Sequence, residues 1–186
     1  TRGTAMQEAV PVGEGTMAAL MGVGIDVAEE IAAEAAQGEI CTAANDNASG
    51  QIVLSGATAA IERAVEIAAE KGAKRCILLP VSAPFHCAMM APAADVMADE
   101  LAAMLIEEPI IPVVANVTAD AQSAPDEIRR LLVEQVTARV RWRESVLFMK
   151  ENGVDTFVEI GAGKVLTGLA RRIDRDLTGI SIQTPA

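Results

Sequence analysis

The order of apolar segments over residues 15–80 is the feature that most limits how this chain can fold. Four strand-like runs alternate with two helical patterns, with strands at 16–23, 40–44, 51–55 and 76–79 and helices at 26–37 and 58–71. An Asn-rich turn joins the two middle strands into a hairpin. This order is the ferredoxin-like split βαβ pattern, so we predict a ferredoxin-like subdomain over residues 15–81.

Beyond residue 82 the chain alternates between helical patterns and short strands. Three apolar runs read as strands, at 110–115, 155–160 and 180–182, and helical patterns lie between them. Such alternation is typical of an α/β fold with a parallel sheet. The run at 110–115 is apolar throughout, which predicts a strand covered on both faces.

Composition excludes several function classes. The net charge of −11 disfavours a nucleic-acid surface, and the longest apolar stretches are too short for a membrane-spanning helix. The three cysteines are widely spaced, and the chain has one histidine and no C-x-x-C pair, so we expect no metal site. Scattered cysteines of this kind indicate reduced thiols in a cytoplasmic protein.

Basic residues are concentrated late in the chain. Ten of the fifteen lie between residues 129 and 175: Arg129, Arg130, Arg139, Arg141, Arg143, Lys150, Lys164, Arg171, Arg172 and Arg175. Solvated helix faces give such a pattern, and so does a docking patch for an acidic partner or for phosphates. Sequence alone leaves both interpretations open.

His86 is the only histidine, and it follows the strand at 76–79 on a Pro-broken turn before a helix that begins near Pro92. Catalytic groups commonly occupy such loops on a rigid scaffold, although a lone structural histidine is the alternative. No G-x-S-x-G elbow is present in the sequence. Four residues qualify as nucleophile by type only: Ser49, Ser55, Ser82 and Cys87. The chain therefore has a plausible base without a convincing nucleophile.

A glycine-rich turn, Gly161-Ala162-Gly163-Lys164, suggests a phosphate loop but lacks the required pattern. A dinucleotide fingerprint needs a third glycine where Leu166 stands, and a P-loop needs Ser or Thr where Val165 stands. The turn still directs backbone N–H groups toward the start of a helix, which is a general anion-friendly feature.

Seven short segments, taken together and in order, resemble the C-terminal part of bacterial malonyl-CoA:acyl carrier protein transacylases. They are residues 2–11, 15–19, 45–53, 80–87, 113–117, 132–136 and 159–166, and the resemblance spans essentially the whole chain. Members of that family take malonyl from coenzyme A onto a serine in a G-H-S-x-G elbow. They then pass it to the phosphopantetheine thiol of acyl carrier protein in fatty acid synthesis.

The resemblance implies roles for particular residues. His86 would be the general base, oriented by the backbone carbonyl at Gln135. Arg2 would bind the free carboxylate of malonyl, because a guanidinium pairs with a carboxylate through two hydrogen bonds. Met6 and Asn47 match positions near the acyl pocket. Phe85 is compatible with malonyl. No cofactor is implied, since the coenzyme A thioester is the substrate.

The sequence departs from the family at three turns. Ala83-Pro84 precedes Phe85 where His-Ala is usual in polyketide acyltransferases, and Ala138-Arg139 stands where Ser-Pro is common. Ala162 replaces the proline of a Gly-Pro-Gly turn. None of these positions carries the expected chemistry directly.

In the family, the serine elbow and a glutamine loop of the oxyanion hole precede the position of Arg2. We therefore expect residues 1–14 and 82–186 to be the C-terminal part of an α/β-hydrolase-like large domain. The expected partners are the missing N-terminal half, malonyl-CoA and acyl carrier protein, and the chain alone would be inactive. Two alternatives remain: a hydrolase on the same fold, and a non-catalytic binding module built on the ferredoxin-like part.

Overall fold

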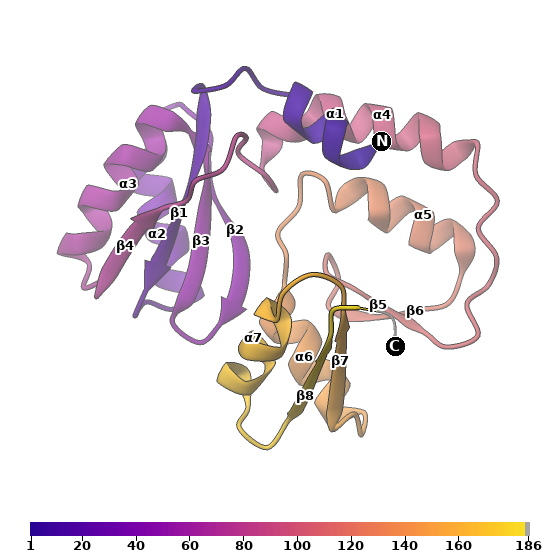
Figure 1. Ribbon diagram of the computed structural model, residues 1–186. Helices are drawn as coiled ribbons and strands as arrows, with labels where there is room; N and C mark the ends of the chain where they lie inside the picture. Colours follow the sequence, from indigo (N-terminus) through magenta and orange to yellow (C-terminus); the bar gives the residue numbers. More distant parts are fainter. Residues whose placement is uncertain (185–186) are drawn as a thin grey trace.

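The computed structural model describes residues 1–184, and its first half contains a four-stranded antiparallel sheet with two helices on one face (Figure 1). The elements are β1 (Gly15–Met21), α2 (Ile25–Ala36), β2 (Cys41–Ala48), β3 (Gln51–Ala57), α3 (Thr58–Glu70) and β4 (Arg75–Leu78). The strands lie in the order β2-β3-β1-β4, and every neighbouring pair is antiparallel. The predicted order of strands and helices over this region is confirmed.

The two faces of this sheet pack against different parts of the chain. Alternation along β1 places Ala18 and Leu20 against α2 and α3, in a core that also contains Ile31 and Ile61. Met17 and Ala19 point to the opposite face, together with Ala44 and Val53 on the neighbouring strands. Leu79, Val81 and Phe85 cover that second face, so the segment after β4 lies directly on the sheet.

The remaining elements form a helical layer and two small sheets. They are α1 (Arg2–Glu8), η1 (Ala88–Met90), α4 (Ala91–Ala102), β5 (Val113–Ala115), β6 (Asp120–Gln122), α5 (Pro125–Glu134), α6 (Trp142–Glu151), β7 (Thr156–Ile160), α7 (Val165–Ile173) and β8 (Thr178–Ile182). Helix α4 packs between α1 and α5 (Figure 1). Strands β7 and β8 form a parallel pair, whereas β5 and β6 form an antiparallel hairpin. The chain is thus an α/β protein with mixed sheets.

The prediction of a covered strand over residues 110–115 was wrong. Ile110 and Ile111 lie outside any strand and are 103% and 74% exposed. Only Val113–Ala115 is extended, and it pairs with β6, which the sequence did not reveal. Pro112 has no backbone N–H to give to a ladder, so pairing begins after it.

The segment between α5 and α6, residues 135–141, lies along the open edge of β2; we call it the α5–α6 linker. Val140 and Asn45 form an isolated parallel bridge. The backbone N–H of Asp46 donates to the Val140 carbonyl at 2.9 Å, and the Val140 N–H donates to the Ala44 carbonyl at 2.8 Å. The linker therefore connects the four-stranded sheet to the helices of the second half.

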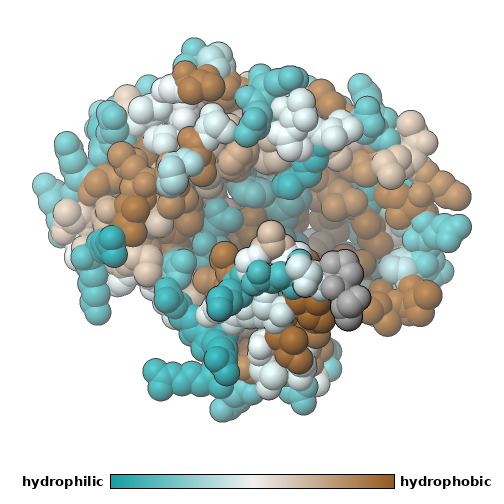
Figure 2. Space-filling model, viewed as in Figure 1, coloured by the Kyte–Doolittle hydropathy of each residue, from teal (hydrophilic) through white to brown (hydrophobic). Residues whose placement is uncertain are grey.

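Strands β7 and β8 expose an apolar surface. Val158 and Ile160 on β7 lie opposite Ile180 and Ile182 on β8, and all four side chains are at least 45% exposed. Figure 2 shows hydrophobic side chains gathered over these two strands. Within residues 1–184, no helix has the length and hydrophobicity needed to cross a membrane.

Candidate active site

The loop that carries His86 is held tightly against the four-stranded sheet. The Leu79 N–H donates to the Met17 carbonyl at 2.9 Å, which continues the β4 pairing beyond the strand. Pro84 is fully buried against Gly15, where an added Cβ would lie 2.3 Å from the Pro84 Cγ. Only glycine at position 15 allows this approach. The loop is thus fixed immediately before the histidine.

His86 has an unusual backbone and a defined hydrogen bond. Its φ of +59° lies in the left-handed region, which costs a residue with a Cβ some strain. Its Nδ1 lies 2.9 Å from the Gln135 carbonyl oxygen. A carbonyl only accepts, so Nδ1 carries the proton and donates, and Nε2 keeps its lone pair. The expected contact between His86 and the Gln135 backbone is present.

The surroundings of His86 favour its neutral form. Burial lowers the pKa of the imidazole, and the positive charge of Arg2 lowers it further. Hydrogen bonds with the backbone of Gln135 and Ala138 act in the opposite direction, but the pKa remains below the ordinary value of 6.5. A neutral imidazole with a free Nε2 is the form that accepts a proton.

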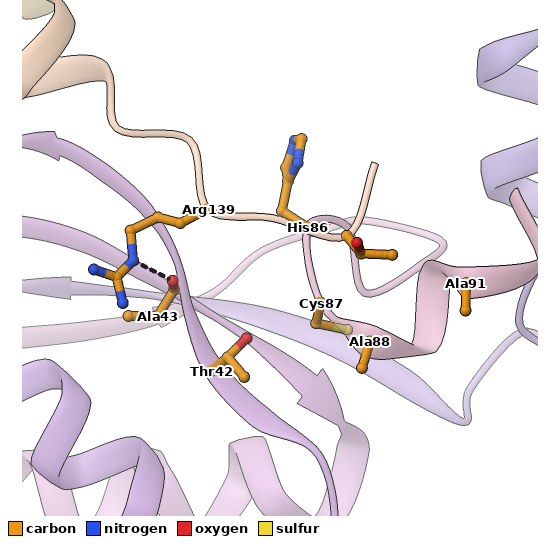
Figure 3. Close-up of a pocket in the computed structure, with 8 residues that line it drawn as sticks. Thr42, Ala43, His86, Cys87, Ala88, Ala91 and Arg139 are labelled. Carbon is orange, nitrogen blue, oxygen red and sulfur yellow. Dashed lines mark hydrogen bonds between the residues drawn. The ribbon is translucent and has the colours of Figure 1, made fainter. Parts of the chain in front are cut away.

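His86 borders an open pocket of about 490 Å³ (Figure 3). The pocket is lined by Thr42, Ala43, His86, Cys87, Ala88, Ala91, Thr137 and Arg139. In Figure 3 the imidazole points away from Thr42, and Arg139 reaches toward β2. The Arg139 Nε donates to the Ala43 carbonyl at 2.8 Å, and its guanidinium pairs with Glu29.

Sequence reasoning did not assign Thr137 and Arg139 to the pocket, although both come from the α5–α6 linker. The departure from the family's Ser-Pro at Ala138-Arg139 was the available signal. It did not reveal that the linker reaches β2, because that contact joins residues almost a hundred positions apart.

The other expected site residues differ in their burial and in their contacts around His86. Met6 is buried in an apolar cluster with Ala83 and Val136, and Phe85 packs against the same cluster. Arg2 is exposed at the start of α1 and close enough to influence His86 electrostatically. Asn47 is half-buried on β2, does not line the pocket, and forms no side-chain hydrogen bond within the part of the chain described. The structure thus gathers His86, Gln135, Phe85 and Met6, whereas Asn47 is not among the residues that line the pocket.

None of the four candidate nucleophiles is bonded to His86 within residues 1–184. Cys87 is 1% exposed, its Sγ–H donates to the Pro84 carbonyl, and burial raises the pKa of the thiol. Ser55 is fully buried, and Ser82 accepts a hydrogen bond from Gln7. A neutral buried thiol is a poor nucleophile. The described residues thus orient the His86 imidazole but place none of these four side chains in a hydrogen bond with it.

The anion-friendly turn before α7 is already occupied. The Glu159 carboxylate accepts hydrogen bonds from the backbone N–H groups of Leu166 and Thr167 and from the Thr167 hydroxyl. These bonds lower the pKa of Glu159, so it stays ionised. The Glu159 carboxylate therefore occupies the place that an external anion would take at the start of α7. Among the described residues, no three His, Cys, Asp or Glu side chains are placed to hold a metal.

Comparison with known proteins agrees with the resemblance drawn from the sequence. The family described as "Acyl transferase domain" matches residues 1–179. Malonyl CoA-acyl carrier protein transacylase of Escherichia coli K12 is 44% identical over 185 residues, and the Bacillus subtilis protein of that name is 42% identical. These alignments cover 100% and 99% of this chain, which spans only 60% and 58% of the relatives' lengths.

Solved structures give the same result. An acyl-carrier-protein-S-malonyltransferase from Bartonella henselae superposes with a TM-score of 0.94 at 54% identity, over 98% of this chain and 58% of that one. A malonyl-transacylase solved in complex with the holo acyl carrier protein of a type II polyketide synthase superposes with a TM-score of 0.94 at 42% identity. That match covers 99% of this chain and 60% of the other. The chain therefore belongs to the acyl transferase domain family.

Proposed function

We propose that this chain is the base-bearing part of a malonyl-CoA:acyl carrier protein transacylase of fatty acid synthesis. The observation that carries this proposal is the His86 imidazole, held neutral and oriented by the Gln135 carbonyl beside a pocket, in a chain 44% identical to a named transacylase. The serine nucleophile would come from outside the 186 residues. The proposed location is the cytoplasm, because three widely spaced cysteines without a C-x-x-C pair are typical of proteins that keep their thiols reduced.

In the proposed reaction, His86 moves a proton in both half-reactions. Nε2 takes the proton of the serine hydroxyl while the serine oxygen attacks the thioester carbonyl of malonyl-CoA. The carbon–sulfur bond then breaks, and the imidazolium returns the proton to the coenzyme A thiolate. The phosphopantetheine thiol of acyl carrier protein repeats these steps in reverse and removes malonyl from the serine. Arg2 holds the malonyl carboxylate, and no cofactor takes part.

We propose the following domain division on the same basis. Residues 15–81 are a ferredoxin-like subdomain, a proposal supported by the β2-β3-β1-β4 order of its sheet. Residues 1–14 and 82–186 are the C-terminal part of an α/β-hydrolase-like domain, supported by the parallel β7–β8 pair. The apolar surface of β7 and β8 is the contact for the N-terminal half of the same enzyme.

A chimera tests the function directly. This chain would replace the segment of the Escherichia coli transacylase that it matches, and malonyl transfer from malonyl-CoA to acyl carrier protein would be measured. We expect transfer within about tenfold of the parent's kcat/KM, because 44% identity and the shared fold preserve the contacts between the halves. Release of free malonate without transfer would favour the hydrolase alternative. A folded chimera that neither transfers nor hydrolyses would favour the binding module.

Acyl carrier protein is the proposed partner of the basic residues on and beside α7. Six of the ten bases between 129 and 175 are in ion pairs, namely Arg129, Arg130, Arg139, Arg141, Arg143 and Lys150. Lys164, Arg171, Arg172 and Arg175 form no ion pair within residues 1–184. Their charge is available to an acidic partner.

Reversing two of these charges, Arg171→Glu with Arg172→Glu, is expected to raise the KM for acyl carrier protein about tenfold in the chimera. The reason is the loss of electrostatic attraction during encounter, so the effect should shrink as salt is added. The KM for malonyl-CoA should not change. The matched control reverses Lys74 and Arg75, two adjacent exposed bases near β4. An equal rise of KM in both double variants would show that only net charge matters.

A further inference from the structure

An ion pair joins α6 to the edge of β2. Arg143 donates from Nε to both carboxylate oxygens of Asp46, at 3.1 and 2.9 Å, and its second nitrogen lies 2.8 Å from Oδ2. Asp46 is 1% exposed, and the Arg143 side chain is 27% exposed. A buried pair of this kind adds little net stability compared with apolar residues. Its best-attested use is to fix one register between two elements.

The register of the α5–α6 linker needs such a device. The linker meets β2 through one isolated bridge, so few backbone hydrogen bonds define its position. β2 itself is irregular there, with register shifts between Ala43 and Asn45 and between Asp46 and Ala48. Bulges of this type redirect side chains and weaken the regular ladder. Beside the hydrogen bond from Arg139 to the Ala43 carbonyl, the Asp46–Arg143 pair supplies a second directional contact that the ladder lacks.

The same linker begins with the residue that orients His86. The Gln135 carbonyl accepts from Nδ1, while the Gln135 side-chain amide donates to the Ala138 carbonyl at 3.0 Å. Gln135 is thus tied to the turn that precedes the bridge at Val140. A shift of the linker along β2 would therefore move the carbonyl that holds the imidazole.

We propose that the Asp46–Arg143 ion pair is a positioning device for His86, acting by fixing the α5–α6 linker on β2 and thereby the carbonyl of Gln135. Arg143 and Asp46 are positioning residues, because neither lines the pocket. The proposal rests on the proposed function for its catalytic consequence. The expected effect on the orientation of the His86 imidazole does not depend on the proposed function and can be measured without an activity assay.

Because His86 is the only histidine, its ring nitrogens give a single pair of ¹⁵N NMR resonances in the 186-residue chain. The unaltered chain should show a protonated Nδ1 and a bare Nε2 above the pKa of the ring. In Arg143→Gln we expect the two tautomers to mix, because the carbonyl no longer holds one orientation. Arg143→Lys, which keeps a cation near Asp46, should restore part of the preference. Arg130→Gln is the matched control, since the ion pairs of Arg130 lie within α5.

The catalytic consequence of the Arg143→Gln substitution is measured as malonyl transfer by the chimera. Arg143→Gln should lower kcat roughly ten- to a hundredfold, the usual effect of a small misplacement of a catalytic group, with the KM for malonyl-CoA unchanged. If Arg143→Gln mixes the tautomers of His86 but the unaltered chimera has no transacylase activity, the positioning role is supported and the proposed function is rejected. Unaltered ¹⁵N resonances in a folded Arg143→Gln chain would overturn the positioning role.

Arg143→Gln leaves a buried carboxylate without its partner, which can prevent folding. The double variant Asp46→Ala with Arg143→Ala removes both charges and every hydrogen bond between the two side chains. It should fold, because no charge remains buried, and show the same mixed tautomers. If neither variant folds, the ion pair is a requirement of the fold itself, and the positioning proposal is rejected.

Discussion

Replacing His86 by alanine in the chimera is expected to lower kcat/KM for malonyl transfer by about 10²–10⁴-fold, the usual contribution of a positioned general base. The imidazole serves both half-reactions, so formation of the malonyl-enzyme and its transfer to acyl carrier protein should slow together. Stopped-flow release of coenzyme A and steady-state transfer measure the two steps. An unchanged rate of coenzyme A release would show that another group activates the nucleophile.

The pH profile of the unaltered chimera gives the control for this result. Burial and Arg2 lower the pKa of His86, so the neutral base persists to lower pH than an exposed histidine would allow. The rate should therefore fall only as the pH drops through a value below 6.5. The His86→Ala variant should lack this acid limb. If the limb stays in place after the substitution, it belongs to another group.

Replacing Arg2 by alanine is expected to abolish the preference for malonyl over acetyl. Loss of a hydrogen bond to a charged group costs about 1.5–3 kcal/mol, which corresponds to roughly ten- to a hundredfold in kcat/KM. The loss should fall on malonyl-CoA alone, because acetyl has no carboxylate. Parallel assays of the two thioesters measure the ratio.

Arg75→Ala is the matched control for Arg2, since it removes another exposed arginine at a strand away from the pocket. It should leave both thioesters unaffected. Arg2→Ala should also raise the pKa of His86, because a positive charge near the imidazole is removed. Selectivity that survives in Arg2→Ala would mean that another cation binds the carboxylate, or that the hydrolase alternative holds.

The sequence predicted best those features that depend on neighbours along the chain. The alternation of apolar residues along β1 and the helical spacing in α2 and α3 are local, so the order of elements over residues 15–81 followed from them. The loop position of His86 and its contact with the Gln135 backbone also agree with expectation. That contact followed from the family resemblance, because no local pattern places residues 86 and 135 side by side.

Features that depend on distant partners were missed or wrongly predicted. The run at 110–115 has the composition of a covered strand, but whether it is covered depends on neighbours that local patterning does not define. The Glu159 carboxylate at the start of α7 was not foreseen, because a glutamate within a strand pattern gives no sign of its target. Asp46 reads as a turn residue in sequence, yet it is buried and paired with Arg143.

The bridge between the α5–α6 linker and β2 limits how this protein can be recombined with its relatives. Carbonyl and N–H groups of Ala43, Ala44 and Asp46 hold the linker, so residues 15–81 contribute to the support of His86 without containing it. Exchange of residues 15–81 alone would place β2 of one parent against the α5–α6 linker of the other. A crossover that carries residues 135–143 together with β2 keeps both sides of the contact in one parent.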